Sequence, residues 1–534
     1  MSKNILTVII LGVAALVAIY LGLVAATGDF VTISAWGGAI LFLTYLLKGQ
    51  NYSLEIYLFL IWGGISFYWG FSVISLHIVA ALFSMHVISS VALRRRPIKV
   101  SGLFKDSGQG FVILTGGIFI LYGFVHILLL RASPQIPGEF SMANSAKAYF
   151  KAFVPVVILL LALGTRVRFK AGEFWARRFF LWLSLAVVMN GAYLGYLYFN
   201  GFSSNNTMGM DRDISMIYIP LINAAPHHFA FRNLGPIAVL FSLAFLTERG
   251  WYKGQGVIMK SAVLVCFLGG LIGSLGSGGR GSFLLCLVFI ILVAFYRKNM
   301  IIIFGALVCS MAVVAFANLF SGFVNEKAPL FVARPLQYFM VDKGESAVTI
   351  ESSTNQRIAL FEAALAEWQS DPRIFIIGRG VYPYKYSFED LRATLGEEGA
   401  FLEVNLRAGT CHALLPSSLL QYGIIGTGIY FTFLFALIWL AWNVYTNSRR
   451  RDCSKGIQTA SFCLFIYFLT KIPLEIIAGG WLDLFFVVML ILVRTRVAEE
   501  EEALNMVIEE ERGQLDPKKS PDSRLPRQEP AMGI

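Results

Sequence analysis

Long apolar blocks separated by short polar segments run along almost the whole chain. A helix needs about 20 mainly apolar residues to cross a bilayer, and blocks of roughly that length predict about fourteen membrane spans. The predicted spans are 5–27, 30–47, 54–71, 73–93, 110–130, 150–165, 179–199, 232–247, 257–276, 282–296, 300–320, 414–444, 457–476 and 480–493. The pattern therefore predicts an all-α polytopic membrane protein, in which the apolar run from Ile5 to Ala26 is a retained first span rather than a signal peptide.

The basic residues support this order of spans. Lys and Arg concentrate in cytoplasmic loops, and with the N-terminus inside every strongly basic cluster falls on the inner side. These clusters are Lys48; Arg94–Arg96 with Lys99 and Lys105; Arg166, Arg168, Lys170, Arg177 and Arg178; Arg249 and Lys253; Arg297 and Lys298; Arg449–Arg451 with Lys455; Arg494 and Arg496. Both termini are therefore expected in the cytoplasm.

The composition fits a membrane protein and excludes some other classes. Hydrophobic residues make up 57% of the chain, above the roughly 45–50% of soluble domains. The net charge of +11 does not indicate nucleic acid binding, because most basic residues lie in short loops between apolar blocks. The six cysteines are scattered without a CxxC pair, so neither a disulfide framework nor a metal cluster is indicated.

Four regions follow from the pattern: spans 1–11 over residues 1–320, a large outer loop over 321–412, spans 12–14 over 413–496, and an acidic tail over 497–534. The tail has the composition of a disordered segment. Two further outer segments, 131–149 and 200–231, are also large, but only 321–412 is big enough to fold over the bundle.

The large outer loop is expected to be mainly helical. Ser353 and Gln356 have the spacing of a capping box, and the apolar positions Ile358, Phe361, Leu365 and Trp368 predict an amphipathic helix that ends at Asp371-Pro372. Gly378-Arg379-Gly380 predicts a tight turn. A second helix is predicted from Phe388 to Leu395, with Gly396 as its cap.

His412 is the main candidate for chemistry. It stands where this loop ends and an apolar helix begins, so it is expected at the membrane surface, where a base would act on a membrane-bound substrate. His77, His86 and His126 lie inside apolar spans and are expected to find partners within the bundle. His228, just before the span that contains Arg232, is a candidate supporting residue, as is Arg232 itself.

Arginines on the outer side are candidate ligands for an anion. Arg280 lies in the glycine-rich break Gly276-Ser277-Gly278-Gly279-Arg280-Gly281, and Arg357 and Arg379 lie in the large loop. A guanidinium fork with nearby backbone N–H donors suits a phosphate. The outer acidic residues form no metal-binding pattern. A metal-independent reaction on an anionic, diphosphate-linked lipid is therefore favoured, with no metal and no cofactor.

Three motifs together resemble the bacterial O-antigen ligase and O-antigen polymerase family. Members carry a His at the end of a large periplasmic loop, then a small polar residue, nine residues and Gly-x-x-Gly; here His412, Ala413, Gly423 and Gly426 have that spacing, with Ala413 in place of the polar residue. Arg280 fits the family's arginine in a serine- and glycine-rich break. Arg357, Pro372 and Gly378-Arg379-Gly380 are similar to its loop pattern. The likeness covers roughly residues 257–444.

The resemblance implies transfer of a glycan from an undecaprenyl diphosphate carrier to a lipid- or glycan-borne acceptor hydroxyl, in the bacterial inner membrane and on its periplasmic side. His412 would be the base, Arg280, Arg357 and Arg379 would bind the diphosphate, and Gly423 and Gly426 would support the site. Ligase, polymerase and protein-glycosylating types stay open. The alternative from another class is a polysaccharide or lipid-linked oligosaccharide flippase, which predicts broken helices and charged residues near the membrane midplane.

Overall fold

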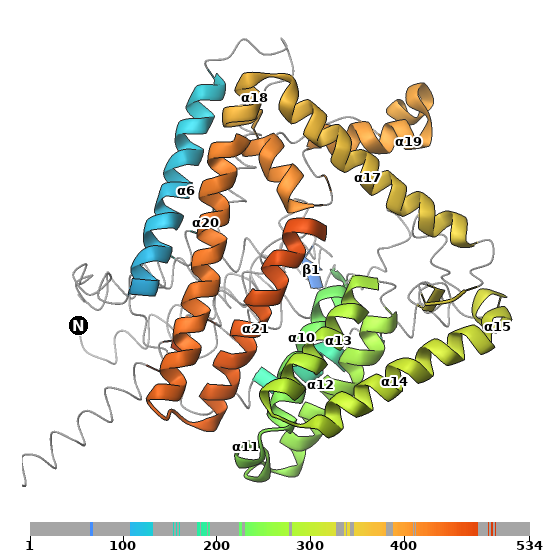
Figure 1. Cartoon of the computed structure of the whole chain (residues 1–534), viewed down its shortest axis with the longest axis vertical. Helices are drawn as coiled ribbons and strands as arrows, with labels where there is room; N and C mark the ends of the chain where they lie inside the picture. Colours follow the sequence, from blue (N-terminus) through green and yellow to red (C-terminus); the bar gives the residue numbers. More distant parts are fainter. Residues whose placement is uncertain are drawn as a thin grey trace, which may run out of the picture.

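The computed structural model of the chain is predominantly helical (Figure 1). It describes residues 65–67, 107–131, 224–226, 230–276, 280–326, 346–380, 388–408 and 413–478, with single positions or short pieces near 153–160, 179–192, 336–341, 411 and 490–497. The predictions for spans 5–27, 30–47, 54–71, 73–93 and 480–493, and for the acidic tail, fall almost entirely outside these residues.

One group of helices forms around α20 (Leu414–Arg450), which α6 (Ser107–Arg131) and α21 (Lys455–Ala478) contact along their lengths (Figure 1). Buried aromatic rings join them: Phe119 of α6 stacks on Tyr430 of α20 at 4.8 Å between ring centroids. The sequence favours this packing because each helix is apolar around most of its circumference.

The second group consists of α10 (Ala230–Leu246), α12 (Val257–Gly276), α13 (Arg280–Tyr296) and α14 (Met300–Leu319), with the short helices α11 (Arg249–Lys253) and α15 (Ser321–Glu326) at their ends. α10 packs closely on α12 because Gly235 and Gly270 face each other: a Cβ on either would lie 2.8–2.9 Å from the carbonyl oxygen of the other. Small residues at such contacts let helix backbones approach.

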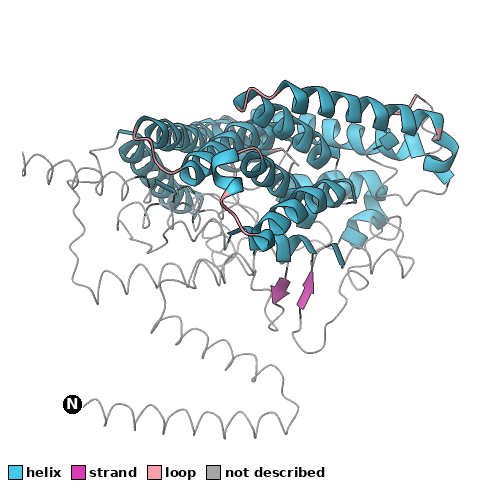
Figure 2. Cartoon of the chain, turned by 90° about the horizontal axis from the view of Figure 1, so that it is seen from below, coloured by secondary structure: helices cyan, strands magenta, loops and turns pink. Residues whose placement is uncertain are grey.

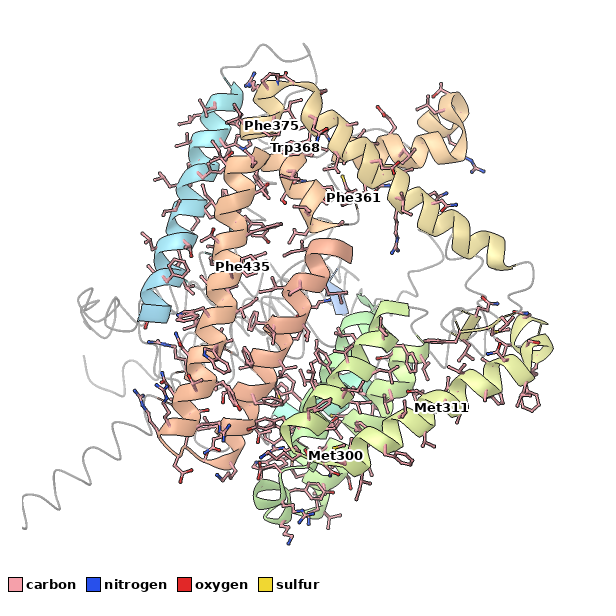
Figure 3. All side chains as sticks on the ribbon, in the orientation of Figure 1. Met300, Met311, Phe361, Trp368, Phe375 and Phe435 are labelled. Atoms are coloured by element: carbon pink, nitrogen blue, oxygen red, sulfur yellow. The ribbon has the colours of Figure 1, made fainter. Side chains whose placement is uncertain are left out.

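Four described helices are long and apolar enough to cross a membrane: those within 108–129, 257–275, 414–450 and 455–474. Shorter apolar helices lie at 179–188, 234–246, 281–296 and 310–319. The predicted blocks at 110–130, 232–247, 257–276, 282–296, 300–320, 414–444 and 457–476 are all helical, so the helical class is confirmed; the total of fourteen spans stays a prediction. Exposed apolar side chains such as Met300, Met311 and Phe435 fit a lipid-facing surface (Figure 3).

One end of these helices, where α11 and the connections between α13 and α14 and between α20 and α21 lie (Figure 1), carries basic residues, and we call it the basic end: Arg249, Lys253, Arg297, Lys298, Arg449–Arg451 and Lys455. Arg297 joins the helices there. Its Nη1 pairs with Glu248, and its Nη2 donates to the Ala244 carbonyl and the Thr459 hydroxyl, both at 3.0 Å. Its guanidinium also lies 4.9 Å from the centroid of the Tyr296 ring.

At the opposite end of α20 lies the described part of the large loop, which consists of α17 (Ser346–Ser370), α18 (Pro372–Ile377) and α19 (Phe388–Ala408) (Figure 1). Gly396, with φ +73°, interrupts α19 where a helix end was predicted, but the helix resumes to Ala408. α17 ends at Ser370, as the predicted end at Asp371-Pro372 requires, and Asp371 also caps α18 by accepting from the Arg373 N–H at 2.8 Å.

Two details of α17 differ from the sequence prediction. The helix begins at Ser346, so Ser353 lies inside it and forms no capping box. The buried face consists of Leu360, Ala364 and Trp368, whereas Ile358 is about half exposed. The small Ala364 lets α17 approach the first turns of α20, and this contact, rather than the apolar stripe alone, sets which face is buried.

A pair of three-residue strands was not predicted. β1 (Ile65–Phe67) and β2 (Ala224–Pro226) pair antiparallel, with Ser66 opposite Ala225 (Figure 2). Segments this short give only a weak sequence pattern.

Candidate active site

α20 is broken near its beginning, and the break organises the site. Gly423 has φ +66° and ψ −173°, so a first piece from Leu414 to Tyr422 turns away from the long piece that follows (Figure 1). Gly378, at the end of α18, has φ +78° and lies against the break. The two glycines therefore meet where the large loop joins the helix bundle.

The segment Gly378–Gly380 is docked on this break, and the chain bends at Arg379, between two glycines with positive φ, where a tight turn was predicted. The Arg379 N–H donates to the Leu420 carbonyl and the Gly380 N–H to the Gln421 carbonyl, both at 2.9 Å. The next carbonyl, of Tyr422, accepts from the Tyr122 hydroxyl of α6 at 2.6 Å. Carbonyls at a helix end lack partners within the helix. Here the docked segment Gly378–Gly380 and α6 supply the missing donors.

The structure explains why glycine occupies these positions. A Cβ on Gly378 would lie 2.5 Å from the backbone of Gln421 and Gly423, and one on Gly423 would collide with the Ile376 carbonyl. A Cβ on Gly426 would collide with the Tyr122 ring. Gly423 and Gly426, the predicted supporting residues, thus both permit close contact with their neighbours, and Gly423 also has the positive φ that other residues rarely adopt.

The corner between α17 and α18 holds the docked segment Gly378–Gly380 in place. The Trp368 ring stacks on the Phe375 ring at 4.5 Å, and its Nε1 donates to the Phe375 carbonyl at 3.0 Å (Figure 3). Arg373 of α18 reaches the Leu129 carbonyl at the end of α6 at 3.4 Å. α18 is therefore fixed to both α17 and α6 before the chain reaches Arg379.

Arg379 is the predicted ligand whose side chain the structure places at this site. Its Nη1 pairs with Glu367 of α17, and the side chain is only 14% exposed. Its Nε and Nη2 are buried and have no hydrogen-bond partner among the described residues. Since nearly all buried polar groups in proteins are hydrogen-bonded, two such donors on one guanidinium indicate a place where an external acceptor could bind.

Cys411, which directly precedes His412, lies beside this ion pair. It is buried against α17 and the first piece of α20, and its N–H donates to the Ser417 hydroxyl at 2.9 Å. Burial raises the pKa of its thiol to about 11; Ser417 and Arg379 lower the pKa and Glu367 raises it, but burial dominates. The thiol is therefore neutral near pH 7 and is no nucleophile. His412 itself lies outside the described residues.

Within the part of the chain that the structure describes, none of the other residues predicted to bind the anion or to support the site is seen next to Arg379. Arg357 is exposed on α17, ten positions before Glu367, which is roughly 15 Å along a helix axis. Arg280 is the first residue of α13, and its side chain is not described; α13 packs on α10, α12 and α14. Arg232 lies in the first turn of α10 without a described side chain, and His228 is outside the described residues.

Two residues of α6 were not predicted as part of the site. Tyr122 contacts the break, and His126, one turn later, is fully buried, stacks on the Tyr122 ring at 5.4 Å and hydrogen-bonds the Gly378 backbone. The expectation that His126 has partners within the protein is confirmed. One feature of the sequence could have indicated these two residues: they form a polar pair at i, i+4 spacing near the end of an otherwise apolar helix.

No family model, curated protein or solved structure matches this chain. Among the described residues, no three His, Cys, Asp or Glu side chains are grouped so that they could hold a metal ion. The function is therefore inferred from the sequence and from the geometry of α20, Arg379 and α6.

Proposed function

We propose that this protein is a membrane glycosyltransferase that moves a glycan from an undecaprenyl diphosphate carrier to an acceptor hydroxyl in surface polysaccharide assembly. It would act in the bacterial inner membrane, with its site on the periplasmic side and without a metal or cofactor. The sequence resemblance to O-antigen ligases and polymerases supports this reaction.

The observation that carries the proposal is the state of Arg379. Its guanidinium is anchored by Glu367 and has two buried donors without an acceptor among the described residues, next to the residue that precedes His412. Two N–H groups of one guanidinium can bind two oxygens of a phosphate in parallel. A base and an anion-binding arginine at one site are the groups that this reaction needs.

In the proposed reaction the acceptor oxygen attacks the anomeric carbon of the donor glycan. The new C–O bond forms as the bond from that carbon to the diphosphate oxygen breaks, and both bonding electrons leave with the lipid diphosphate. His412 accepts the hydroxyl proton, for which an imidazole with a pKa near 6.5 is suited. Arg379, and in this proposal Arg280 and Arg357, stabilise the negative charge that grows on the leaving group.

The depth of the break in α20 favours this reaction over transport. A flippase of the type considered above would place broken helices near the membrane midplane. Here the break lies nine residues from the start of α20, and the remaining 27 residues, 424–450, span about 40 Å, more than the roughly 30 Å of the hydrocarbon core. The break therefore fits a site at the membrane surface.

The test uses the purified full chain in vesicles with an undecaprenyl diphosphate-linked oligosaccharide, and the product is followed by mass. We expect the wild type to form a new glycosidic bond and His412→Ala to lose about 100- to 10,000-fold in rate. Passage of the lipid-linked glycan across the vesicle membrane without bond formation would support the flippase instead. A His412→Ala variant that is correctly inserted and fully active would overturn the role of His412.

A deletion strain distinguishes the three types within this class. A single repeat unit on the lipid A core indicates a polymerase, free lipid-linked polymer indicates a ligase, and unmodified glycoprotein indicates a protein-glycosylating enzyme.

A further inference from the structure

Tyr122 and His126 of α6 both contact the chain at the end of α18, at Ile377 and Gly378. They are four positions apart on one helix, so their side chains lie on one face, and their rings stack. The Tyr122 hydroxyl lies 2.6 Å from the Tyr422 carbonyl and 3.2 Å from the Ile377 carbonyl, and it also hydrogen-bonds the Gly426 backbone. His126 hydrogen-bonds the backbone of Gly378.

These contacts connect three segments that are far apart in the sequence. The Tyr122 hydroxyl touches the end of α18 and both pieces of the broken α20, and a phenol has only one proton to share between the two carbonyls. The hydroxyl therefore fixes the distance between Ile377 and Tyr422. That distance sets the register in which the Arg379 and Gly380 N–H groups meet Leu420 and Gln421.

We propose that Tyr122 and His126 are positioning residues: they clamp the segment Gly378–Gly380 onto the broken α20 and so hold the Arg379 guanidinium where it binds the donor diphosphate. The proposal rests on the proposed function for the identity of the ligand. It adds two residues of α6 that act through Arg379.

The variants Tyr122→Phe and His126→Phe test the clamp, since each keeps an aromatic ring and removes the polar atoms. Tyr445→Phe is the matched control: it also removes a hydrogen-bonded hydroxyl, one that accepts from Arg449 at 3.3 Å, but at the other end of α20. Amide hydrogen exchange is measured on peptides covering 378–380 in the full chain. We expect exchange there to become about tenfold faster in the two α6 variants and to stay unchanged in the control.

Kinetics on the lipid-linked oligosaccharide give the second readout. A displaced Arg379 should raise the KM for the donor about five- to tenfold, with a smaller change in kcat. A purely structural role would lower the amount of active enzyme, and hence the apparent kcat, without moving KM. Unchanged exchange at 378–380, or faster exchange with an unchanged KM, would overturn the positioning role.

Binding of undecaprenyl diphosphate itself, measured by native mass spectrometry, separates this proposal from the function on which it rests. If the wild type binds this lipid but forms no glycosidic bond, the proposed function fails, and weaker binding by Tyr122→Phe still supports the clamp. Equal binding by the wild type and both α6 variants overturns the clamp.

Discussion

An arginine pairs with a glutamate at the basic end and another at the end where α20 is broken, but the two arginines make different kinds of contact. At the basic end, Arg297 uses Nη1 for Glu248 and Nη2 for the Ala244 carbonyl and the Thr459 hydroxyl, and it packs against an aromatic ring. At the other end, Arg379 uses only Nη1, for Glu367. Arg297 thus has acceptors for two of its three guanidinium nitrogens and Arg379 for one, since the Nε of Arg297 and the Nε and Nη2 of Arg379 are buried without a hydrogen-bond partner among the described residues.

The helix contacts differ in the same way. Near the basic end, side chains cross between α20 and α21, as in the 2.7 Å hydrogen bond between the Ser448 and Ser461 hydroxyls. At the broken end, backbone groups of a docked loop complete the helix. Side-chain contacts therefore join the helices at the basic end, whereas backbone groups of a loop complete the broken end.

The largest expected effect separates the two arginines by activity. Arg379→Gln removes the open donors, so we expect kcat/KM for glycan transfer to fall about 100- to 1000-fold, the usual loss when a group that stabilises transition-state charge is removed. Arg297→Gln should leave the rate per folded molecule unchanged. Steady-state kinetics on both purified variants give the comparison, and an Arg379→Gln rate within twofold of wild type would contradict it.

The second effect separates them by stability. Arg297→Gln leaves the Glu248 carboxylate, only 15% exposed, without its partner, and breaking such a pair costs about 3–5 kcal/mol. Arg379→Gln should cost less, because Glu367 is 28% exposed and better hydrated. Thermal unfolding in detergent measures both. The double variant Arg297→Gln/Glu248→Gln should recover part of the loss; no recovery would mean that packing, not charge, is the cause.

A smaller effect is expected from the break itself. Gly423→Ala places a side chain at positive φ and against the Ile376 carbonyl, so we expect a loss of roughly 1–3 kcal/mol and weaker donor binding. Gly428→Ala, five residues later in the helical part and with open space around its Cα, is the control and should be neutral or stabilising by up to about 1 kcal/mol. Equal unfolding temperatures for the two variants would argue against a strained break.

The smallest effect concerns pH. The pKa of Cys411 is raised to about 11 in the folded protein, mainly by burial, whereas the exposed thiol of the unfolded chain ionises near 8.5. The unfolded state thus loses its proton first, and this contribution to stability, complete below about pH 8.5, is lost as the pH rises to about 11. Unfolding temperatures from pH 7 to 11 should fall more steeply in the wild type than in Cys411→Ala. Parallel curves would show that the thiol is not buried.

The sequence predicted the helices better than the contacts between them. The ends of α12 and α14 agree with the apolar blocks within one residue, because charged or turn-forming residues bound them. The start of α17 was missed because the polar stretch 351–356 separates its first turn from the apolar period that follows. Helix existence depends on nearby residues, so it can be read from a local pattern.

The contacts within the candidate site, in contrast, could not be predicted from a local pattern. Arg379, Gly423 and Gly426 were identified from spacing and resemblance, but their geometry depends on α6, a helix about 300 residues earlier in the chain. No local pattern indicates that Tyr122 meets Gly426 or that Gly378 meets Gly423. Such close approaches come from long-range packing, and they decide which donors of Arg379 stay open.

The contact between Tyr122 and Tyr422 joins positions 300 residues apart. During synthesis, α6 enters the membrane long before the ribosome reaches the codons for α20, so Tyr122 must wait for its partner carbonyl. A nascent chain that stops before residue 414 lacks both pieces of the broken helix and cannot dock Gly378–Gly380. The segment Gly378–Gly380 can therefore dock only after both pieces of α20 have been synthesised.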